Sequence, residues 1–222
     1  MYKNTILILA CLATSFIADC CYAEEEIKKE YYPSGYLKKT VPYKDGEVDG
    51  KMRFYNENGD ITQEIYYEKG EKLIATLYYK NGRVSVERPY KNGEAEGVEK
   101  GYYESGELKT ETPYKAGQIE GVIKGYYRNG KISVETPYKN GRIEGVEKSY
   151  FENGKLKQEI PFRYGIMKGI AKIYDENGEC MEVPFQNGVK EGVSKCYDKD
   201  GKLIAEYTYK NGEVIDSRKI SQ

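Results

Sequence analysis

The stretch Tyr102-Tyr103-Glu104-Ser105-Gly106-Glu107-Leu108-Lys109, continued by Pro113-Tyr114-Lys115-Ala116-Gly117, decides the fold of this chain. Gly106 and Gly117 mark two tight turns, because glycine adopts a positive φ without a steric penalty. Tyr102 lies four residues before the first glycine, and Tyr114 lies three residues before the second. The stretch therefore predicts the turn of one β-hairpin, its return strand and the turn that leads out of it.

The same unit recurs eight times at spacings of 23 or 24 residues, so we expect eight tandem repeats over residues 31–222. A tyrosine precedes each first-turn glycine by four residues: Tyr31, Tyr55, Tyr78, Tyr102, Tyr126, Tyr150, Tyr174 and Tyr197. An aromatic residue precedes each second-turn glycine by three residues: Tyr43, Tyr67, Tyr90, Tyr114, Tyr138, Phe162, Phe185 and Tyr209. A third glycine follows in six units: Gly50, Gly97, Gly121, Gly145, Gly169 and Gly192. We interpret both aromatic series as structural residues of the repeat.

Apolar residues alternate with polar ones along each expected strand, as in residues 131–138, which predicts one apolar, aromatic face and one charged face. A three-residue turn with a glycine bulge would place Tyr102 opposite Leu108 on the apolar face. Tyr102, Tyr126 and Tyr150 should then be more buried than Tyr103 and Tyr127. The expected strands lie near residues 98–103, 107–114, 122–127, 131–138, 146–151 and 155–162, with homologous strands on either side.

A proline precedes the second aromatic in six units, and we expect it to end the strand: Pro42, Pro89, Pro113, Pro137, Pro161 and Pro184. Every connection is short and no segment beyond the first residues has helical periodicity. The predicted fold class is all-β, an elongated single-layer antiparallel β-meander of about sixteen strands built from tandem β-hairpin repeats. The second unit lacks the third glycine and is expected to be irregular, and the eighth ends in Val214-Ile215-Asp216 as a terminal cap.

The first residues are typical of an export signal. Lys3 precedes an apolar run from Ile6 to Ala18, and Cys21 and Ala23 fit a signal-peptidase site. We expect a signal peptide over residues 1–23, a short linker over 24–30, and a periplasmic, cell-surface or secreted protein. A lipoprotein is the alternative, although Asp19 before Cys20 does not suit the lipidation motif.

The composition argues against several classes of function. The formal net charge is −1, whereas nucleic-acid binders usually carry a basic excess, so we expect no nucleic-acid partner. The chain has no histidine, which excludes Ser-His, Cys-His and His-metal arrangements. Glu87, Glu111, Glu135 and Glu159 recur once per unit, as solvated partners of lysine do. We therefore expect no enzyme, no cofactor and no metal.

The pattern from Tyr102 to Lys109, with Pro113 to Gly117 and Glu120-Gly121, resembles MORN repeats over about residues 31–215. It is most similar to the bacterial variant that is often assigned as the antitoxin of a toxin–antitoxin pair. The resemblance implies a binding array, since the family includes partner-binding and membrane-associated scaffolds.

A Tyr-rich sheet face suits recognition, although tyrosines also pack on one another and on neighbouring turns. We expect an exported scaffold that binds a protein partner or a surface polymer along this face. An antitoxin-like neutraliser and a membrane-associated spacer are the alternatives, with membrane contact only through a lipid anchor.

Two cysteines follow the leader, Cys180 and Cys196. With Val183 opposite Val193 they would face each other and could form a disulfide in an oxidising compartment. The alternative is two unrelated small apolar residues.

Overall fold

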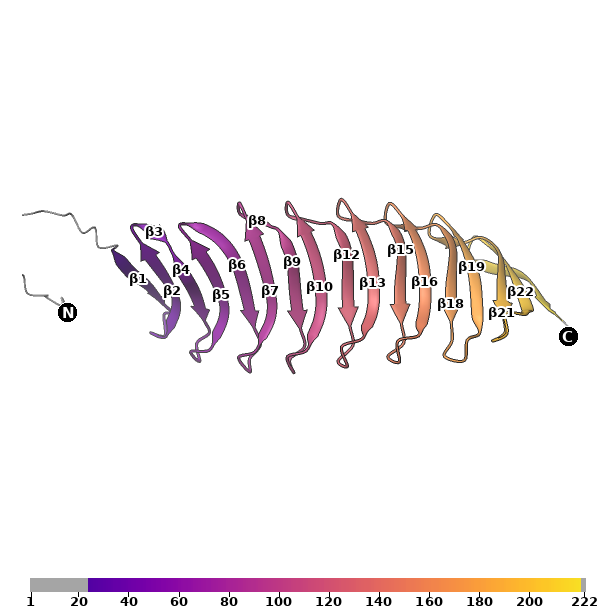
Figure 1. The fold of residues 1–222 in the computed structure, drawn as a ribbon, viewed down its shortest axis with the longest axis horizontal. Helices are drawn as coiled ribbons and strands as arrows, with labels where there is room; N and C mark the ends of the chain where they lie inside the picture. The colour runs from indigo at the N-terminus through magenta and orange to yellow at the C-terminus, as the bar shows by residue number, and fades with distance from the viewer. Residues whose placement is uncertain (1–23, 221–222) are drawn as a thin grey trace, which may run out of the picture.

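The structure, a computed structural model, describes residues 24–220, which form a 23-stranded open antiparallel sheet of successive hairpins (Figure 1). The predicted fold class, an all-β antiparallel meander, is confirmed. Six of the strands are two-residue segments beside a turn. The strands are β1 (Glu25–Tyr31), β2 (Leu37–Lys44), β3 (Glu47–Val48), β4 (Gly50–Tyr55), β5 (Ile61–Glu68), β6 (Glu71–Tyr78), β7 (Val84–Lys91), β8 (Glu94–Ala95), β9 (Gly97–Tyr102), β10 (Leu108–Lys115), β11 (Gln118–Ile119), β12 (Gly121–Tyr126), β13 (Ile132–Lys139), β14 (Arg142–Ile143), β15 (Gly145–Tyr150), β16 (Leu156–Arg163), β17 (Ile166–Met167), β18 (Gly169–Tyr174), β19 (Cys180–Gln186), β20 (Val189–Lys190), β21 (Gly192–Tyr197), β22 (Leu203–Lys210) and β23 (Glu213–Lys219).

The first turn of each repeat closes the hairpin as the sequence predicts. In the β9–β10 hairpin, the amide of Gly106 donates to the carbonyl of Tyr103 at 2.8 Å. Tyr102 pairs with Leu108, and Gly101 pairs with Thr110, so Lys109 is an extra, bulged residue. The predicted Tyr102–Leu108 pairing is therefore confirmed, and the equivalent pairs of Tyr126 and Tyr150 are present as well.

The bulge nevertheless corrects the expected faces of the sheet. Lys100 is two residues before Tyr102 in β9, and Lys100 pairs with Glu111. Side chains two residues apart in a strand share a face, so Tyr102 lies with Lys100 and Glu111, not on the apolar face. We call this side of the sheet the Tyr–Glu face. The expectation that Tyr102 belongs to the apolar face was wrong because the extra residue reverses the alternation at the strand end.

The second turn is a two-residue hairpin turn. Ala116 and Gly117 both have positive φ, at 47° and 73°, and Tyr114 pairs with Ile119 across them. After this pair Glu120 and Gly121 form a bulge, where the amide of Glu120 donates to the carbonyl of Pro113 at 3.1 Å. The backbone N and C=O of one strand residue point to the same side of the strand. The nitrogen of Pro113 therefore faces this bulge, as its carbonyl does, and the amide hydrogen that proline lacks would point there. The expectation that proline ends the strand was wrong, since β10 continues two residues further, to Lys115.

The N-terminal end of the array differs from expectation, whereas the C-terminal end agrees with it. Residues 24–30, expected as a linker, contain most of β1, which pairs with β2 along its whole length. At the other end β23 pairs with β22 and covers the last hairpin as the expected cap. In the second unit, which lacks the third glycine, β6 runs unbroken over Glu71–Tyr78. The predicted signal peptide and Cys20 lie outside the described residues.

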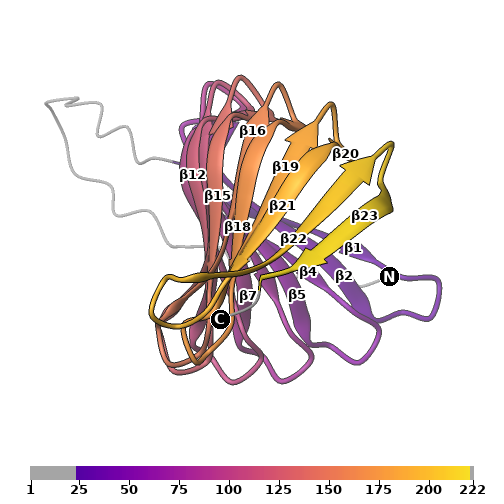
Figure 2. The same cartoon turned by 90° about the vertical axis from the view of Figure 1, so that its right-hand side faces the viewer.

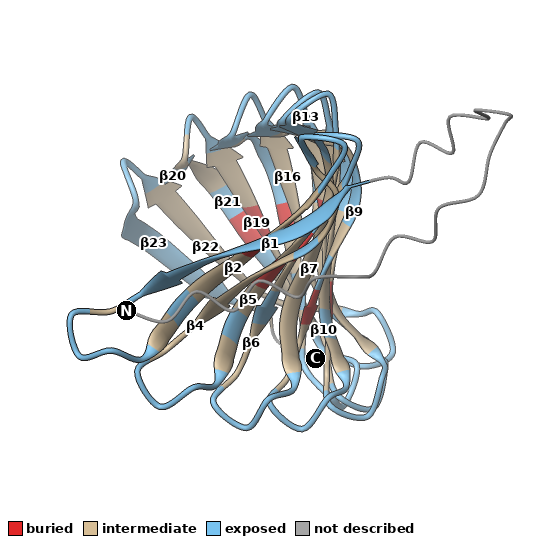
Figure 3. Cartoon of the chain, turned by 90° about the vertical axis from the view of Figure 1, so that its left-hand side faces the viewer, coloured by how far each residue is buried: buried red, intermediate tan, exposed pale blue. Residues whose placement is uncertain are grey.

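The sheet is a single twisted layer with little interior. Viewed along its length, the strands fan around the long axis (Figure 2). The few buried stretches lie in the middle of strands such as β19 (Figure 3). Val41, Ala75, Ala171 and Val183 are the buried hydrophobic side chains, and all four lie on the side opposite the Tyr–Glu face. Stability therefore rests on contacts between neighbouring repeats, as in other repeat arrays. No helix in the described residues is long and apolar enough to cross a membrane.

Candidate binding face

A ladder of opposite charges runs along the middle of the Tyr–Glu face. Lys100 stands between Glu87 and Glu111, and the alternation continues without interruption to Glu206 and Arg218. The members between them are Lys124, Glu135, Lys148, Glu159, Lys172, Glu182 and Lys195. Cross-strand pairs of opposite charge contribute a few tenths of a kcal/mol to about 1 kcal/mol each. The ladder thus accounts for the glutamate that recurs once per unit as a partner of lysine.

A row of tyrosines lies beside this ladder. The hydroxyls of Tyr102, Tyr126 and Tyr150 donate to Glu87, Glu111 and Glu135 at 2.9, 2.6 and 2.8 Å, each reaching the preceding hairpin. Tyr78 and Tyr197 make the equivalent bonds to Glu64 and Glu182. Partial burial, together with the bonded carboxylate, raises the pKa of Tyr126 and of Tyr150 to about 12. The tyrosine row therefore ties each repeat to the one before it.

One acid of this face is buried. Glu64 is 8% exposed and accepts hydrogen bonds from Arg53 at 2.7 Å, Lys51 at 3.1 Å and Tyr78 at 2.8 Å. Burial raises the pKa of this carboxyl, but the bonds from Arg53, Tyr78 and Lys51 outweigh burial and leave the pKa lowered. The cluster is a satisfied ion network rather than a general acid, because each bond favours the charged form.

An aliphatic stripe follows the other side of the charge ladder. It consists of one exposed residue per unit, between 42% and 55% exposed: Ile74, Val98, Val122, Val146, Ile170 and Val193. Five of the six stand opposite a proline in the neighbouring strand, as Val122 stands opposite Pro137. Shallow hollows lie between successive units, one of them lined by Val98, Lys100, Glu111, Pro113, Val122 and Lys124. Sequence reasoning missed this stripe, although in five of the six units its signal is the aliphatic residue directly after the third glycine.

The second tyrosine of the Tyr-Tyr pair has a different position from the one expected. Tyr103 follows β9, in the turn, and its hydroxyl donates to the carbonyl of Tyr126 in the next hairpin at 2.7 Å. Tyr127 makes the same contact with Tyr150 at 2.6 Å. Tyr102 and Tyr103 are both half-buried. The two tyrosines thus share the half-buried range, because the contact with the next hairpin covers the second tyrosine.

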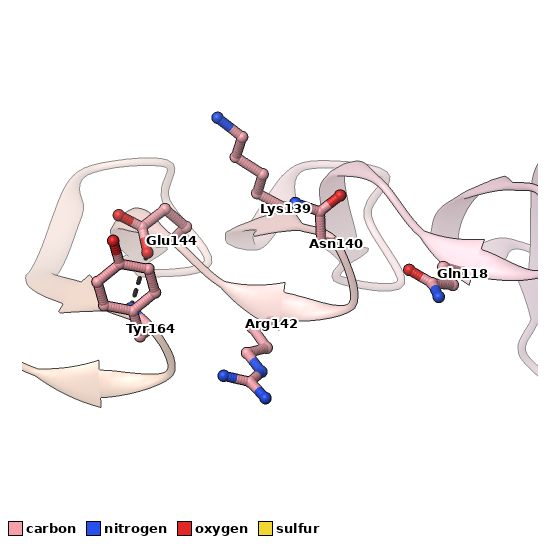
Figure 4. Close-up of a pocket in the computed structure, with 6 residues that line it drawn as sticks. All are labelled: Gln118, Lys139, Asn140, Arg142, Glu144 and Tyr164. Carbon is pink, nitrogen blue, oxygen red and sulfur yellow. Dashed lines mark hydrogen bonds between the residues drawn. The ribbon is translucent and has the colours of Figure 1, made fainter.

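The two-residue turns line one long edge of the sheet and are also tied to one another. At six of the seven junctions between successive turns, a carboxylate accepts the backbone amide of the next turn, as Glu144 accepts from Tyr164 at 2.7 Å (Figure 4). Gln118, Lys139, Asn140 and Arg142 line a polar hollow together with Glu144 and Tyr164. A carboxylate that already bonds to the backbone is not free for acid–base chemistry. This edge is a structural seam.

The two cysteines do not meet. Cys180 pairs with Tyr197, and Met181 pairs with Cys196, so the two thiols lie on opposite faces and both are free. The expected Val183–Val193 register was wrong by one residue, because the bulge at Glu191-Gly192 shifts the pairing. Burial raises the pKa of both thiols.

The geometry defines a tandem-repeat β-sheet scaffold with one long, regularly patterned face. The model of the MORN repeat variant family matches seven stretches of the chain: residues 27–45, 48–69, 73–92, 95–116, 119–140, 143–164 and 190–211. These cover more than half of the sequence, so the chain belongs to this family. The search of curated proteins found no match.

Proposed function

We propose that this protein is an exported, non-enzymatic scaffold that binds an extended protein partner along the Tyr–Glu face. The observation that carries the proposal is the aliphatic stripe, which exposes one Ile or Val in each of six successive units. Exposed apolar rows on a soluble protein usually mark an interaction surface. A stripe flanked by paired charges suits a partner with apolar side chains at regular intervals.

The tyrosine row favours a protein over a surface polymer. Tyr102, Tyr126 and Tyr150 are half-buried and their hydroxyls are already bonded to glutamates. Their rings are therefore less available for stacking than the aliphatic stripe is for packing. Each lysine of the ladder stands opposite a glutamate, so the row as a whole has little net charge to attract a partner. The regular alternation of charges instead adds specificity to the binding of a partner.

The test combines localisation with site-specific crosslinking. The native protein is first located by cell fractionation, and a photo-crosslinker at Val122 is then used in that fraction to capture what lies on the stripe. We expect a protein adduct, lost in the variant V98E/V146E/I170E, which keeps the crosslinker at position 122 and changes the stripe on both sides of it. The matched control is I166E/V189E, which places the same chemistry at exposed positions of the turn edge.

Two results would overturn the proposal. One is a carbohydrate adduct, which would indicate a surface polymer. The other is equal capture by the stripe variant and the turn-edge control. A protein found in the cytosolic fraction would contradict the export part alone.

A further inference from the structure

Strand β1 is a lateral edge of the sheet. Among the described strands it pairs only with β2, and all seven of its residues are exposed. Ile27 is the third of these residues and is 62% exposed. Edge strands of this length are templates for further pairing unless a bulge, a proline or uncompensated charge blocks them.

The unpaired backbone groups of β1 are those of Glu25, Ile27 and Lys29. Ile27 pairs with Pro42, whose carbonyl accepts from Asp49 and therefore points away from β1. Ile27 and Pro42 are then a non-hydrogen-bonded pair, and the N–H and C=O of Ile27 point outward. The carbonyl of Glu24 points inward, to the amide of Asp45 at 3.1 Å, which agrees with the same alternation.

The charges of β1 are antisymmetric about Ile27. The run Glu25-Glu26-Ile27-Lys28-Lys29 meets a second, antiparallel copy of itself with Glu opposite Lys at every charged position. Ile27 then faces Ile27 of the second copy, in a hydrogen-bonded pair that uses the outward groups. A shift by one pair in either direction places Lys28 opposite Lys28, or Glu26 opposite Glu26. At the ends Glu30 faces Glu24, but Glu30 is already paired with Lys39 at 2.8 Å.

The other edge of the sheet is protected. Within the β22–β23 pairing, Thr208 pairs with Asp216 and Tyr209 with Val214, so Ile215 is a bulged residue in β23. A bulge bends an edge away from further pairing. A contact between β1 and β23 of another copy would also be head-to-tail and open-ended, whereas β1 against β1 closes with two-fold symmetry.

We propose that two copies of this chain associate through β1, antiparallel about a two-fold axis at Ile27, so that one sheet continues across the interface. The occupant of the β1 edge is thus a second copy. The pairing doubles the length of the Tyr–Glu face and leaves the aliphatic stripe uncovered.

The test uses sedimentation velocity on the natural chain and four variants, all of full length. The double variants K28E/K29E and E25K/E26K change exposed side chains and give β1 a single sign of charge. We expect dimers for the natural chain, monomers for each double variant, and dimers again when the two are mixed. The quadruple variant E25K/E26K/K28E/K29E reverses the pattern and should dimerise. The matched control is S217E/K219E, at exposed positions of the bulged edge outside the charge ladder, which should not change the dimer.

A local measurement accompanies this test. Hydrogen exchange should show the amide of Ile27 protected in the natural chain and exposed in each double variant. The variant I27P removes the outward donor without a bond to β2 and should be monomeric. A monomeric natural chain with an unprotected Ile27 amide would overturn the proposal. So would double variants that dimerise as well alone as when they are mixed.

Discussion

The hydroxyl of Tyr126 donates a 2.6 Å hydrogen bond to Oε2 of Glu111, which lies 15 residues earlier, in the preceding hairpin. The same relationship joins Tyr102 to Glu87 and Tyr150 to Glu135. The repeats are thus coupled by side chains as well as by the backbone ladder. In a one-dimensional array this coupling decides how far unfolding in one unit spreads to its neighbours.

These tyrosines should make the protein sensitive to alkali. The pKa of Tyr126 and of Tyr150 is about 12 in the folded protein, against about 10 for an unfolded chain. A folded pKa above the unfolded value contributes stability that is complete below pH ~10 and is lost as the pH rises through about 12. An alkaline titration followed by phenolate absorbance should show a group of tyrosines that ionise late. The variant Y126F should have one late-ionising tyrosine fewer than the natural chain. At pH 7 the loss of this bond should cost about 1 kcal/mol. An unchanged late group in Y126F would contradict the assignment.

Glu64 should determine the acid sensitivity of the N-terminal repeats. Its pKa is lowered in the folded state, so its contribution is present above the ordinary carboxyl pKa and is lost as the pH falls through the folded value. We expect E64Q to lower the free energy of unfolding at pH 7 by about 1–3 kcal/mol, since it removes charge-assisted bonds from Arg53 and Lys51.

The matched control for Glu64 is E159Q, at the equivalent position in a later unit. Glu159 is only partly buried and pairs with Lys148 at 3.5 Å. Urea titrations at pH 7 and pH 3 compare the two variants. The difference in stability between E64Q and the natural chain should be smaller at pH 3 than at pH 7, because the contribution of a lowered carboxyl pKa declines as the pH falls. An equal effect of both variants would refute the special role of Glu64.

The sequence predicts the hairpins well because glycine spacing and period-two alternation are local signals. The Tyr102–Leu108 pairing follows from the turn length alone. Which face Tyr102 occupies does not, because one bulged residue at Lys109 reverses the alternation. The register around Cys180 and Cys196 fails for a related reason, since a two-residue bulge at Glu191-Gly192 shifts the pairing. Bulges depend on the contacts of two strands, which a single unit does not reveal.

The candidate face was predicted only in part. The tyrosine row was expected from its spacing, but its bonds to glutamate join residues of different units. The aliphatic stripe cannot be recognised in one unit of the sequence. Val122 follows a turn glycine, and the next residue on the same face of its strand is Lys124, which is charged. The continuity of the stripe arises only when the strands are placed side by side.

Gly121 should tolerate substitution less well than an ordinary turn glycine. It has a φ of +117°, and an added Cβ would lie 3.1 Å from Cγ of Pro113. Gly130 has a φ of +81° and open space around it, so it is the control for the backbone cost alone. We expect G130A to cost about 1 kcal/mol and G121A more. Urea unfolding measures both. The double variant G121A/P113A should recover the steric part, and equal costs for the two single variants would show that the Pro113 contact is unimportant.

Lys168 marks the weakest junction on the turn edge, and its replacement by glutamate should stabilise the protein. At six junctions a carboxylate accepts the backbone amide of the next two-residue turn: Asp49 with Lys69, Glu71 with Asn92, Glu96 with Ala116, Glu120 with Asn140, Glu144 with Tyr164, and Glu191 with Asn211. At the seventh junction, Lys168 occupies the acid's place opposite Asn187, and the amide of Gly188 still bonds to Met167 at 2.9 Å. The turns are thus already aligned there.

A glutamate at position 168 can therefore accept the amide of Asn187, which should raise the free energy of unfolding by about 1 kcal/mol. The variant K168Q is the control, because it removes the lysine charge and supplies a weaker acceptor. Urea titration should rank K168E above K168Q and the natural chain, and hydrogen exchange should show new protection at the amide of Asn187. If K168E is no more stable than K168Q and the amide of Asn187 exchanges as before, the carboxylate contacts along this edge do not stabilise the array.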